Sequence, residues 1–250
     1  MKREFSWSIR TTLCCAALAF GCQPKGAGAE LQSPQEASKA CGPEGLIDDM
    51  EDNNNQVMLR GGRNGYWYTF VDDAGSTVTP EAGAKGGTFT QSEGGTKGSA
   101  YAARFHGTIG TGAIVYAGVG ANLVDPKDAY NASAYDGIGF YAKKGPGVGK
   151  VRLKIPDHNT DPQAGVCKEC YNDFGIEMEL TGKWTKYVVP FSVMKQDQGW
   201  GDPLVPRITP TKLFGIQFQV NVPGQPYDIW IDDLMFTGCG SAKPPAGEAK

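Results

Sequence analysis

Short apolar segments separated by Gly, Pro, Asn and Asp run through the chain, and no window has a long helical period. Segments of this length and spacing predict β-strands. The predicted strands are residues 66–71, 101–106, 113–119, 137–142, 150–155, 175–180, 184–191, 213–220 and 227–236. Residues 192–195 alone are predicted to form a turn of helix, capped by Ser192. The pattern therefore predicts an all-β domain.

Apolar and polar side chains alternate along these strands, so each strand has two different faces. In residues 213–220, Ile216 and Phe218 fall on one face, and Gln217 and Gln219 fall on the other. Residues 150–155 show the same alternation, with Arg152 on the polar face. One apolar face per strand is typical of two sheets packed together. We predict a jelly-roll β-sandwich of two antiparallel sheets, although a closed up-and-down barrel would fit nearly as well.

The string Ile-Asp-Asp occurs twice, in residues 46–52 and again in residues 227–236. If the first and last strands of one domain lie side by side, the carboxylates of the two strings converge. A bound hard cation such as Ca²⁺, held by oxygen ligands, offsets that repulsion. The alternative is that these acids are solvent-facing residues at strand ends and turns.

The first 40 residues are predicted to serve export and anchoring. Residues 1–21 have a basic start and a short apolar run, as in a signal peptide. The run ends in Gly21-Cys22, which resembles a bacterial lipobox with its leucine one place early, so Cys22 is the predicted lipidation residue. Cleavage by an ordinary signal peptidase or a free cysteine are the alternatives. Residues 22–40 read as a flexible tether, residues 41–240 as the folded domain and residues 241–250 as a loose tail.

Four cysteines remain outside the predicted signal and lipidation site, which agrees with an exported compartment. Cys41, Cys167, Cys170 and Cys239 allow three disulfide pairings. Cys41 and Cys239 flank the first and last strands, so position favours their pairing and leaves Cys167 with Cys170. The Cys167–Cys170 motif could instead be half of a zinc site or a redox pair, but the chain has no second such motif and only two histidines.

Candidate ligand-binding residues lie on a polar strand face and in two loops. Arg152, Gln217 and Gln219 can hydrogen-bond sugar hydroxyls, although such residues also simply keep an exposed sheet face soluble. Residues 156–173 form a long polar loop whose candidates are Asp157, His158, Asn159, Asp161, Tyr171 and Asp173. In residues 195–202, Trp200 stands between two glycines, where it either stacks on a sugar ring or folds back as a plug.

Catalytic and nucleic-acid-binding functions find little support in the sequence. The net charge is −3, which gives no basic surface for nucleic acid. The common hydrolase and nucleotide motifs are absent. Asp157 with Asp173, or Glu177 with Glu179, have the residue types of a glycosidase pair, but acids are plentiful in this chain. We therefore predict that the protein is not an enzyme.

Several segments together resemble a known group of domains: LIDDMED, DGIGFYAKK, VRLKIPDHNTDP, WTKYVVPF, GIQFQV and YDIWIDDL. Residues 46–236 resemble the family 11 carbohydrate-binding modules and the domain of complex I intermediate-associated protein 30, both galactose-binding-like jelly rolls. The resemblance implies a structural calcium where the first and last strands meet, with Glu51 and Asp233 as ligands and Asp49 or Asp52 as additions. It also implies a β-glucan groove on the concave sheet, containing Arg152, Asp157, Gln217 and Gln219 beside Asp173 and Trp200. The cysteine-containing loop departs from the family pattern.

These observations predict a monomeric, non-catalytic polysaccharide-binding protein with β-glucan as one candidate ligand. The protein is expected to be exported and lipid-anchored to the bacterial cell envelope, at the outer membrane. The alternatives are a protein-interaction or adhesion domain on the envelope and, less favoured, a glycoside-acting enzyme.

Overall fold

A computed structural model describes residues 41–83 and 89–239. The predicted signal peptide (1–21), Cys22, the tether (22–40) and the tail (241–250) lie outside the described residues. Within the described ranges, no helix has both the length and the apolarity needed to cross a membrane.

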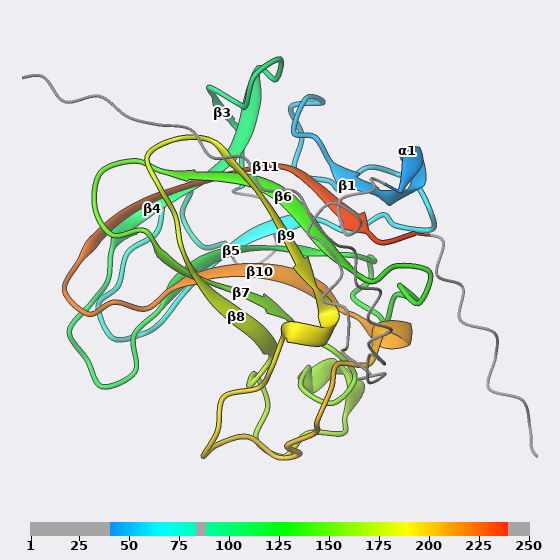
Figure 1. Cartoon of the computed structure of the whole chain (residues 1–250). Helices are drawn as coiled ribbons and strands as arrows, with labels where there is room; N and C mark the ends of the chain where they lie inside the picture. Colours follow the sequence, from blue (N-terminus) through cyan, green and yellow to red (C-terminus); the bar gives the residue numbers. More distant parts are fainter. Residues whose placement is uncertain (1–40, 84–88, 240–250) are drawn as a thin grey trace, which may run out of the picture. The chain divides into compact units, whose positions relative to one another are not determined.

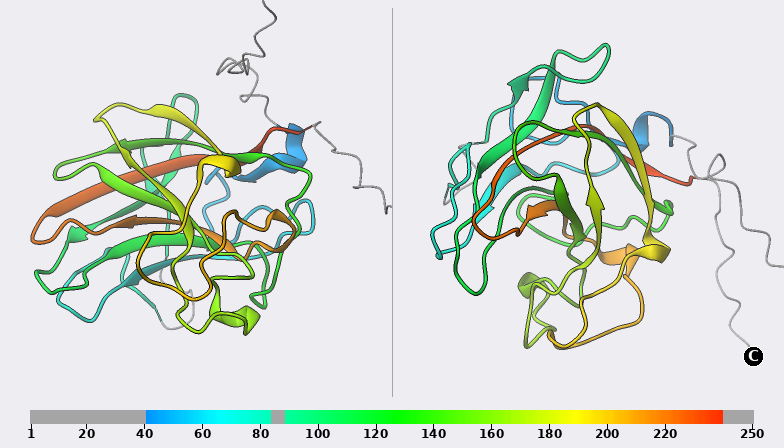
Figure 2. Two further views of the ribbon diagram at one scale, coloured as in Figure 1. Left: turned by 60° about the horizontal axis from the view of Figure 1, so that its bottom comes forward. Right: turned by 60° about the vertical axis from the view of Figure 1, so that its left-hand side comes forward.

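Two antiparallel sheets form the two layers of the fold (Figures 1 and 2). The first has the order β3 (Ser92–Glu93), β4 (Tyr101–Thr108), β11 (Pro226–Thr237), β6 (Gly137–Lys144) and β9 (Thr185–Pro190), with β1 (Leu46–Asp48) beside β11. The second has the order β2 (Trp67–Val71), β5 (Ala117–Asn122), β10 (Gly215–Val220), β7 (Lys150–Ile155) and β8 (Phe174–Glu179). The prediction of a jelly-roll sandwich is confirmed.

The core lies between the sheets and follows the alternation in the sequence. On β10, Ile216, Phe218 and Val220 point inward and are 0% exposed, whereas Gln217 and Gln219 point outward. Phe218 meets Phe140 of β6 edge to face, with 4.9 Å between the ring centroids. Each such fully buried side chain contributes about 1.5–3 kcal/mol to stability, so the apolar stripe of each strand fixes which face packs inward.

Two local predictions were wrong. Residues 113–119 were predicted as a strand, but β5 runs from Ala117 to Asn122 and Ile114 is a loop residue with 77% exposure. The outward positions of β5 are the glycines Gly118 and Gly120, so apolar alternation does not mark this strand. The predicted helical turn begins one residue early, as the 3-10 helix η2 (Phe191–Val193), and Ser192 makes no capping hydrogen bond.

Both predicted disulfides are present, Cys41–Cys239 and Cys167–Cys170. β1 pairs antiparallel with β11, so the condition for bringing the two Ile-Asp-Asp strings together is met. The helix α1 (Gly42–Gly45) leads directly into β1, and the Cys41–Cys239 bridge ties this start of the fold to the end of β11. The remaining short helices are η1 (Pro162–Ala164) and η3 (Pro210–Lys212).

Candidate functional site

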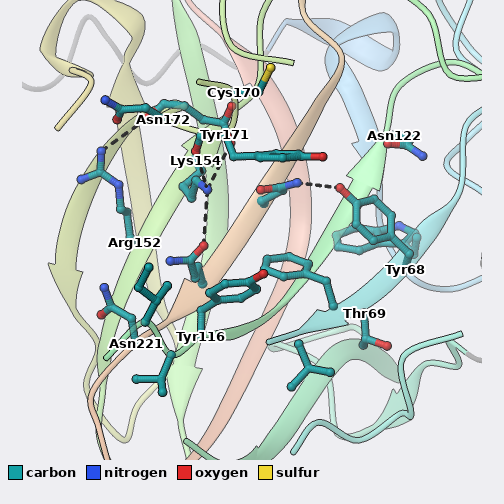
Figure 3. A pocket seen from close by; sticks show the side chains of 18 of the residues that line it. Tyr68, Thr69, Tyr116, Asn122, Arg152, Lys154, Cys170, Tyr171, Asn172 and Asn221 are labelled. Carbon is teal, nitrogen blue, oxygen red and sulfur yellow. Dashed lines mark hydrogen bonds and ion pairs between the residues drawn. The ribbon is translucent and has the colours of Figure 1, made fainter. Parts of the chain in front are cut away.

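A groove of 1510 Å³ covers the outer face of the second sheet. Outward-facing side chains of β2, β10 and β7 form its floor, together with the loops before β8 and after β9. Tyr68 and Tyr171 approach the groove from opposite sides (Figure 3). A concave site of this size, open along a sheet, suits an extended ligand better than a compact one.

Aromatic rings form the floor on the β2 side. Tyr68 and Phe70 alternate with the core residue Trp67 and lie across β5, where they pair with Gly120 and Gly118. A Cβ atom on Gly118 would lie 2.3 Å from Cζ of Phe70, and one on Gly120 would lie 2.7 Å from Cζ of Tyr68. The glycines therefore let both rings lie against the sheet, where they form an aromatic strip of the kind that stacks on sugar rings.

A polar row occupies the centre of the groove. Gln217 pairs with Lys154, and Gln219 pairs with Arg152, in the register of β10 and β7. Nε2 of Gln217 donates to the hydroxyl of Tyr68 at 2.8 Å, and Nζ of Lys154 donates to Oε1 of Gln219 at 3.3 Å. Burial raises the pKa of Tyr68, so its phenol stays neutral and keeps its proton for hydrogen bonding.

Asp173 is the most unusual polar group of the groove. Its side chain is 2% exposed, and Oδ2 lies 3.1 Å from Nζ of Lys154. Its other oxygen, Oδ1, is buried and has no hydrogen-bond partner among the described residues. An unpaired buried carboxylate oxygen costs about 1–3 kcal/mol.

Two loops, 156–173 and 195–202, form one wall of the groove and are bound to each other. Nδ2 of Asn172 donates to the carbonyls of Asp197 (2.9 Å) and Trp200 (2.6 Å), and Oδ1 of Asn172 accepts from the Asp197 amide at 2.9 Å. Arg152 extends this contact, with NH1 3.1 Å from Oδ1 of Asp197. Tyr171 is 62% exposed and Trp200 is 44% exposed on this wall, so both rings are free to contact a ligand.

The structure brings together five of the six predicted ligand-binding residues: Arg152, Asp173, Trp200, Gln217 and Gln219 all line the groove. Asp157 does not, and its predicted role is corrected. It is 0% exposed, and its carboxylate accepts hydrogen bonds from the amides of Asn159 (2.8 Å) and Thr209 (2.8 Å). Burial raises the pKa of Asp157, whose role in this structure is to hold two loops together.

Tyr171, a candidate from the polar loop, also lines the groove. Other groove residues were not predicted from the sequence: Tyr68, Phe70, Tyr116, Lys154 and Asn172. The alternation around Trp67 was the available signal for Tyr68 and Phe70. The carboxylate pairs considered for glycoside cleavage do not fit the groove as pairs. Asp157 lies outside it, and Glu177 lines it without Glu179, with Oε2 of Glu177 2.9 Å from Nζ of Lys150.

Solved structures share this architecture. A family 11 carbohydrate-binding module of the cellulosomal cellulase Lic26A-Cel5E of Clostridium thermocellum superposes with a TM-score of 0.55 at 14% identity, covering 78% of this chain and 94% of that chain. This chain therefore has the same jelly-roll fold as that module. A family 11 module from the same organism, in complex with a β-1,3-1,4-mixed-linked tetrasaccharide, superposes with a TM-score of 0.53 at 15% identity, covering 78% of this chain and 95% of that chain. No protein-family model and no curated protein matches the sequence.

Three of the predicted calcium ligands lie near one another: Asp49 and Glu51 follow β1, and Asp233 belongs to β11. Burial and the charges of Asp49 and Glu51 raise the pKa of Asp233. Glu51, however, binds the 99–101 loop: Oε1 accepts from the Ser99 hydroxyl at 2.7 Å and the Tyr101 amide at 2.9 Å. These backbone and hydroxyl hydrogen bonds lower the pKa of Glu51.

The oxygen chemistry of Asp49, Glu51 and Asp233 suits calcium. Among the residues that the structure describes, however, no three His, Cys, Asp or Glu side chains are gathered as metal ligands. The calcium site stays a prediction.

Proposed function

We propose that this protein binds a polysaccharide chain in the groove of the second sheet without catalysing a reaction. One observation carries the proposal: the aromatic strip of Tyr68 and Phe70 lines the same groove as a row of hydrogen-bonding side chains that includes Gln217 and Gln219. Sugar rings offer an apolar face for stacking and hydroxyl groups that donate hydrogen bonds, so both features have a partner in the same ligand.

The charges of the groove favour a neutral glycan. Arg152 is paired with Asp197, and Lys154 with Asp173, so neither cation is free to receive an acidic sugar. A neutral sugar needs no free cation and can hydrogen-bond Gln217 and Gln219 through its hydroxyl groups. We propose β-glucan as the ligand class, in line with the tetrasaccharide bound by a module of the same fold.

We expect Tyr68→Ala and Trp200→Ala each to weaken binding to a soluble mixed-linked β-glucan by about tenfold, since each removes one stacking surface. Isothermal titration calorimetry measures the affinity, and thermal unfolding checks that each variant folds. Trp184→Ala is the matched control, because Trp184 packs on Lys143 of the other sheet, 4.6 Å from its ammonium.

Three outcomes of this experiment separate the candidate functions. Unchanged affinity of both groove variants would contradict the proposed site. A folded wild-type chain that binds no member of a glycan panel would instead point to a protein partner on the same exposed wall. Release of reducing ends from the glycan would indicate an enzyme.

We further propose that calcium binds beside Asp49 and Asp233, where it would offset their mutual repulsion. If so, adding CaCl₂ to chelator-treated protein raises its melting temperature. At a free calcium concentration one hundred times the dissociation constant, the free energy of unfolding rises by about 2.7 kcal/mol. Asp233→Asn should abolish that shift, and Asp73→Asn, an exposed aspartate outside the cluster, should retain it. An equal calcium response in both variants would contradict this site.

We also propose that the protein is exported and held on the cell envelope by a lipid on Cys22. The support is the short apolar run that ends at Gly21-Cys22, together with two disulfides, which persist in oxidising compartments. Mass spectrometry of the mature N-terminus tests the proposal: a diacylated Cys22 is the expected result, and an unmodified residue 22 would refute it.

A further inference from the structure

The Cys167–Cys170 disulfide lies in the wall of the groove rather than in the core. Cys170 lines the groove, and the three residues that follow it, Tyr171, Asn172 and Asp173, line it too. Cys167 and Cys170 are both half-buried, so the bridge is not packed inside the sandwich. Its position next to the ligand-facing residues distinguishes it from Cys41–Cys239, which joins the ends of the fold.

Every residue from Glu169 to Asp173 makes a contact that shapes the wall, apart from Cys170 itself. Glu169 accepts from the Gly201 amide at 3.0 Å through Oε2, and Asn172 binds Asp197 and Trp200 as described above. The Tyr171 amide donates to the Thr160 carbonyl at 2.9 Å. Asp173 is ion-paired with Lys154. The disulfide therefore stands at the start of a segment that is tied down by the side chains of Glu169, Asn172 and Asp173 and by the backbone of Tyr171.

Tyr171 has a φ of +73°, a left-handed backbone conformation that residues other than glycine, asparagine and aspartate rarely adopt. Such a conformation persists only where the surrounding structure determines it. The covalent link immediately before Tyr171 and the hydrogen bond from its amide supply that constraint. The carbonyl of Tyr171 in turn accepts from Nζ of Lys154 at 3.3 Å, so the conformation of Tyr171 also places the cation that pairs with Asp173.

The Cys167–Cys170 disulfide contributes little to the stability of the whole fold. Its cysteines are three positions apart in the sequence, whereas Cys41 and Cys239 are 198 apart. The entropy that a cross-link removes from the unfolded chain grows with the length of the loop that it closes. A bridge this short therefore mainly restricts the conformations of its own loop.

We propose that the Cys167–Cys170 disulfide positions the ligand-binding wall of the groove, and that its loss weakens ligand binding while the fold keeps its stability. The effect on affinity rests on the proposed glycan-binding function, whereas the effect on loop order does not. Pre-organised loops bind more tightly because ordering them costs conformational entropy when the ligand arrives.

The test compares Cys167→Ser/Cys170→Ser with Cys41→Ser/Cys239→Ser in the full chain. Amide hydrogen exchange is measured first, without ligand. In the first variant, we expect the Tyr171, Asp197 and Gly201 amides to exchange at least about tenfold faster than in wild type, with a nearly unchanged melting temperature. The second variant should show the opposite: a lower melting temperature and wild-type exchange at these three amides under native conditions.

Affinity for the β-1,3-1,4-mixed-linked tetrasaccharide is measured next. We expect the Cys167→Ser/Cys170→Ser variant to bind at least about tenfold more weakly than wild type. Adding Tyr171→Ala should weaken binding about tenfold in the wild-type background and less than about twofold without the disulfide, since the backbone that presents the ring is then no longer fixed. Equal costs in both backgrounds would overturn the positioning role.

Two further results for the Cys167→Ser/Cys170→Ser variant would overturn this inference. One is unchanged exchange at the three amides, and the other is a melting temperature that falls as far as in the Cys41→Ser/Cys239→Ser variant. If wild type binds no glycan at all, the proposed function fails, and the exchange rates alone still decide whether the disulfide orders the wall.

Discussion

Replacing Cys41 and Cys239 by serine is expected to lower the free energy of unfolding by about 3–5 kcal/mol and the melting temperature by about 10 °C. The two cysteines are separated by 198 positions, so their bridge closes nearly the whole folded domain into one loop. The bridge also holds β1 against β11, since Cys41 precedes α1 and Cys239 follows β11. β1 has only three residues and depends on this neighbour for its place in the sheet.

Chemical denaturation followed by tryptophan fluorescence measures the loss. Because the unfolded chain without the bridge is less compact, the dependence of the unfolding free energy on denaturant should also become steeper. Cys167→Ser/Cys170→Ser is the matched control, with the same chemistry in a loop of only four residues. Equal losses in the two double variants would show that the closed loop length is not the source of the stabilisation.

The fold was predictable because its signal is repeated on many strands. Each inward stripe, such as Ile216 and Phe218 on β10, points to the same arrangement of two packed sheets, and the error on β5 did not change it. The pairing of Cys41 with Cys239 was also predictable, since the two cysteines flank the matching acidic strings near the first and last strands. Strand β3 escaped prediction because two residues, Ser92 and Glu93, carry no periodicity.

The site was less predictable because it depends on where loops fold. Gln217 and Gln219 could be placed from alternation alone, since their strand positions fix their direction. Asp157 and Asp173 both belong to one polar loop and both are buried, yet only Asp173 lines the groove. No periodicity separates them, because their positions depend on contacts with residues far along the chain. Asp157 accepts from the amide of Thr209, 52 positions away, and Asn172, the neighbour of Asp173, accepts from the amide of Asp197, 25 positions away.

A further expected result concerns pH: the folded protein should lose stability as the pH rises from about 4 to about 7. Asp48 is the main cause. It is 0% exposed on β1, and burial raises its pKa from 3.8 to about 7 against the opposing effect of hydrogen bonds from the Met50 amide and Nε1 of Trp67. The folded protein therefore retains a proton that the unfolded chain has already released in this pH range.

The sign and size of the effect follow from this difference. The stabilisation by the bound proton is fully present below about pH 4 and is lost as the pH rises through about 7. A shift of this size corresponds to about 4 kcal/mol for one group. Asp232, with its pKa raised by burial to about 6, acts in the same direction. Glu51 and Asp72 have lowered pKa values, so their contributions are lost only at more acidic pH.

Asp48→Asn isolates the contribution of Asp48, because the amide does not ionise. The variant should be less stable than wild type at pH 5, since an amide cannot accept both hydrogen bonds and leaves one donor unpaired at a cost of about 1–3 kcal/mol. That deficit should shrink or disappear at pH 8, where wild type carries the buried charge.

Denaturant unfolding across this pH range in the presence of a calcium chelator measures the stability of Asp48→Asn and of wild type, with Asp73→Asn as the exposed control. Parallel curves for Asp48→Asn and wild type would show that Asp48 ionises equally easily in the folded and unfolded chain, and the pH dependence would then have to come from Asp232 and the other buried carboxylates.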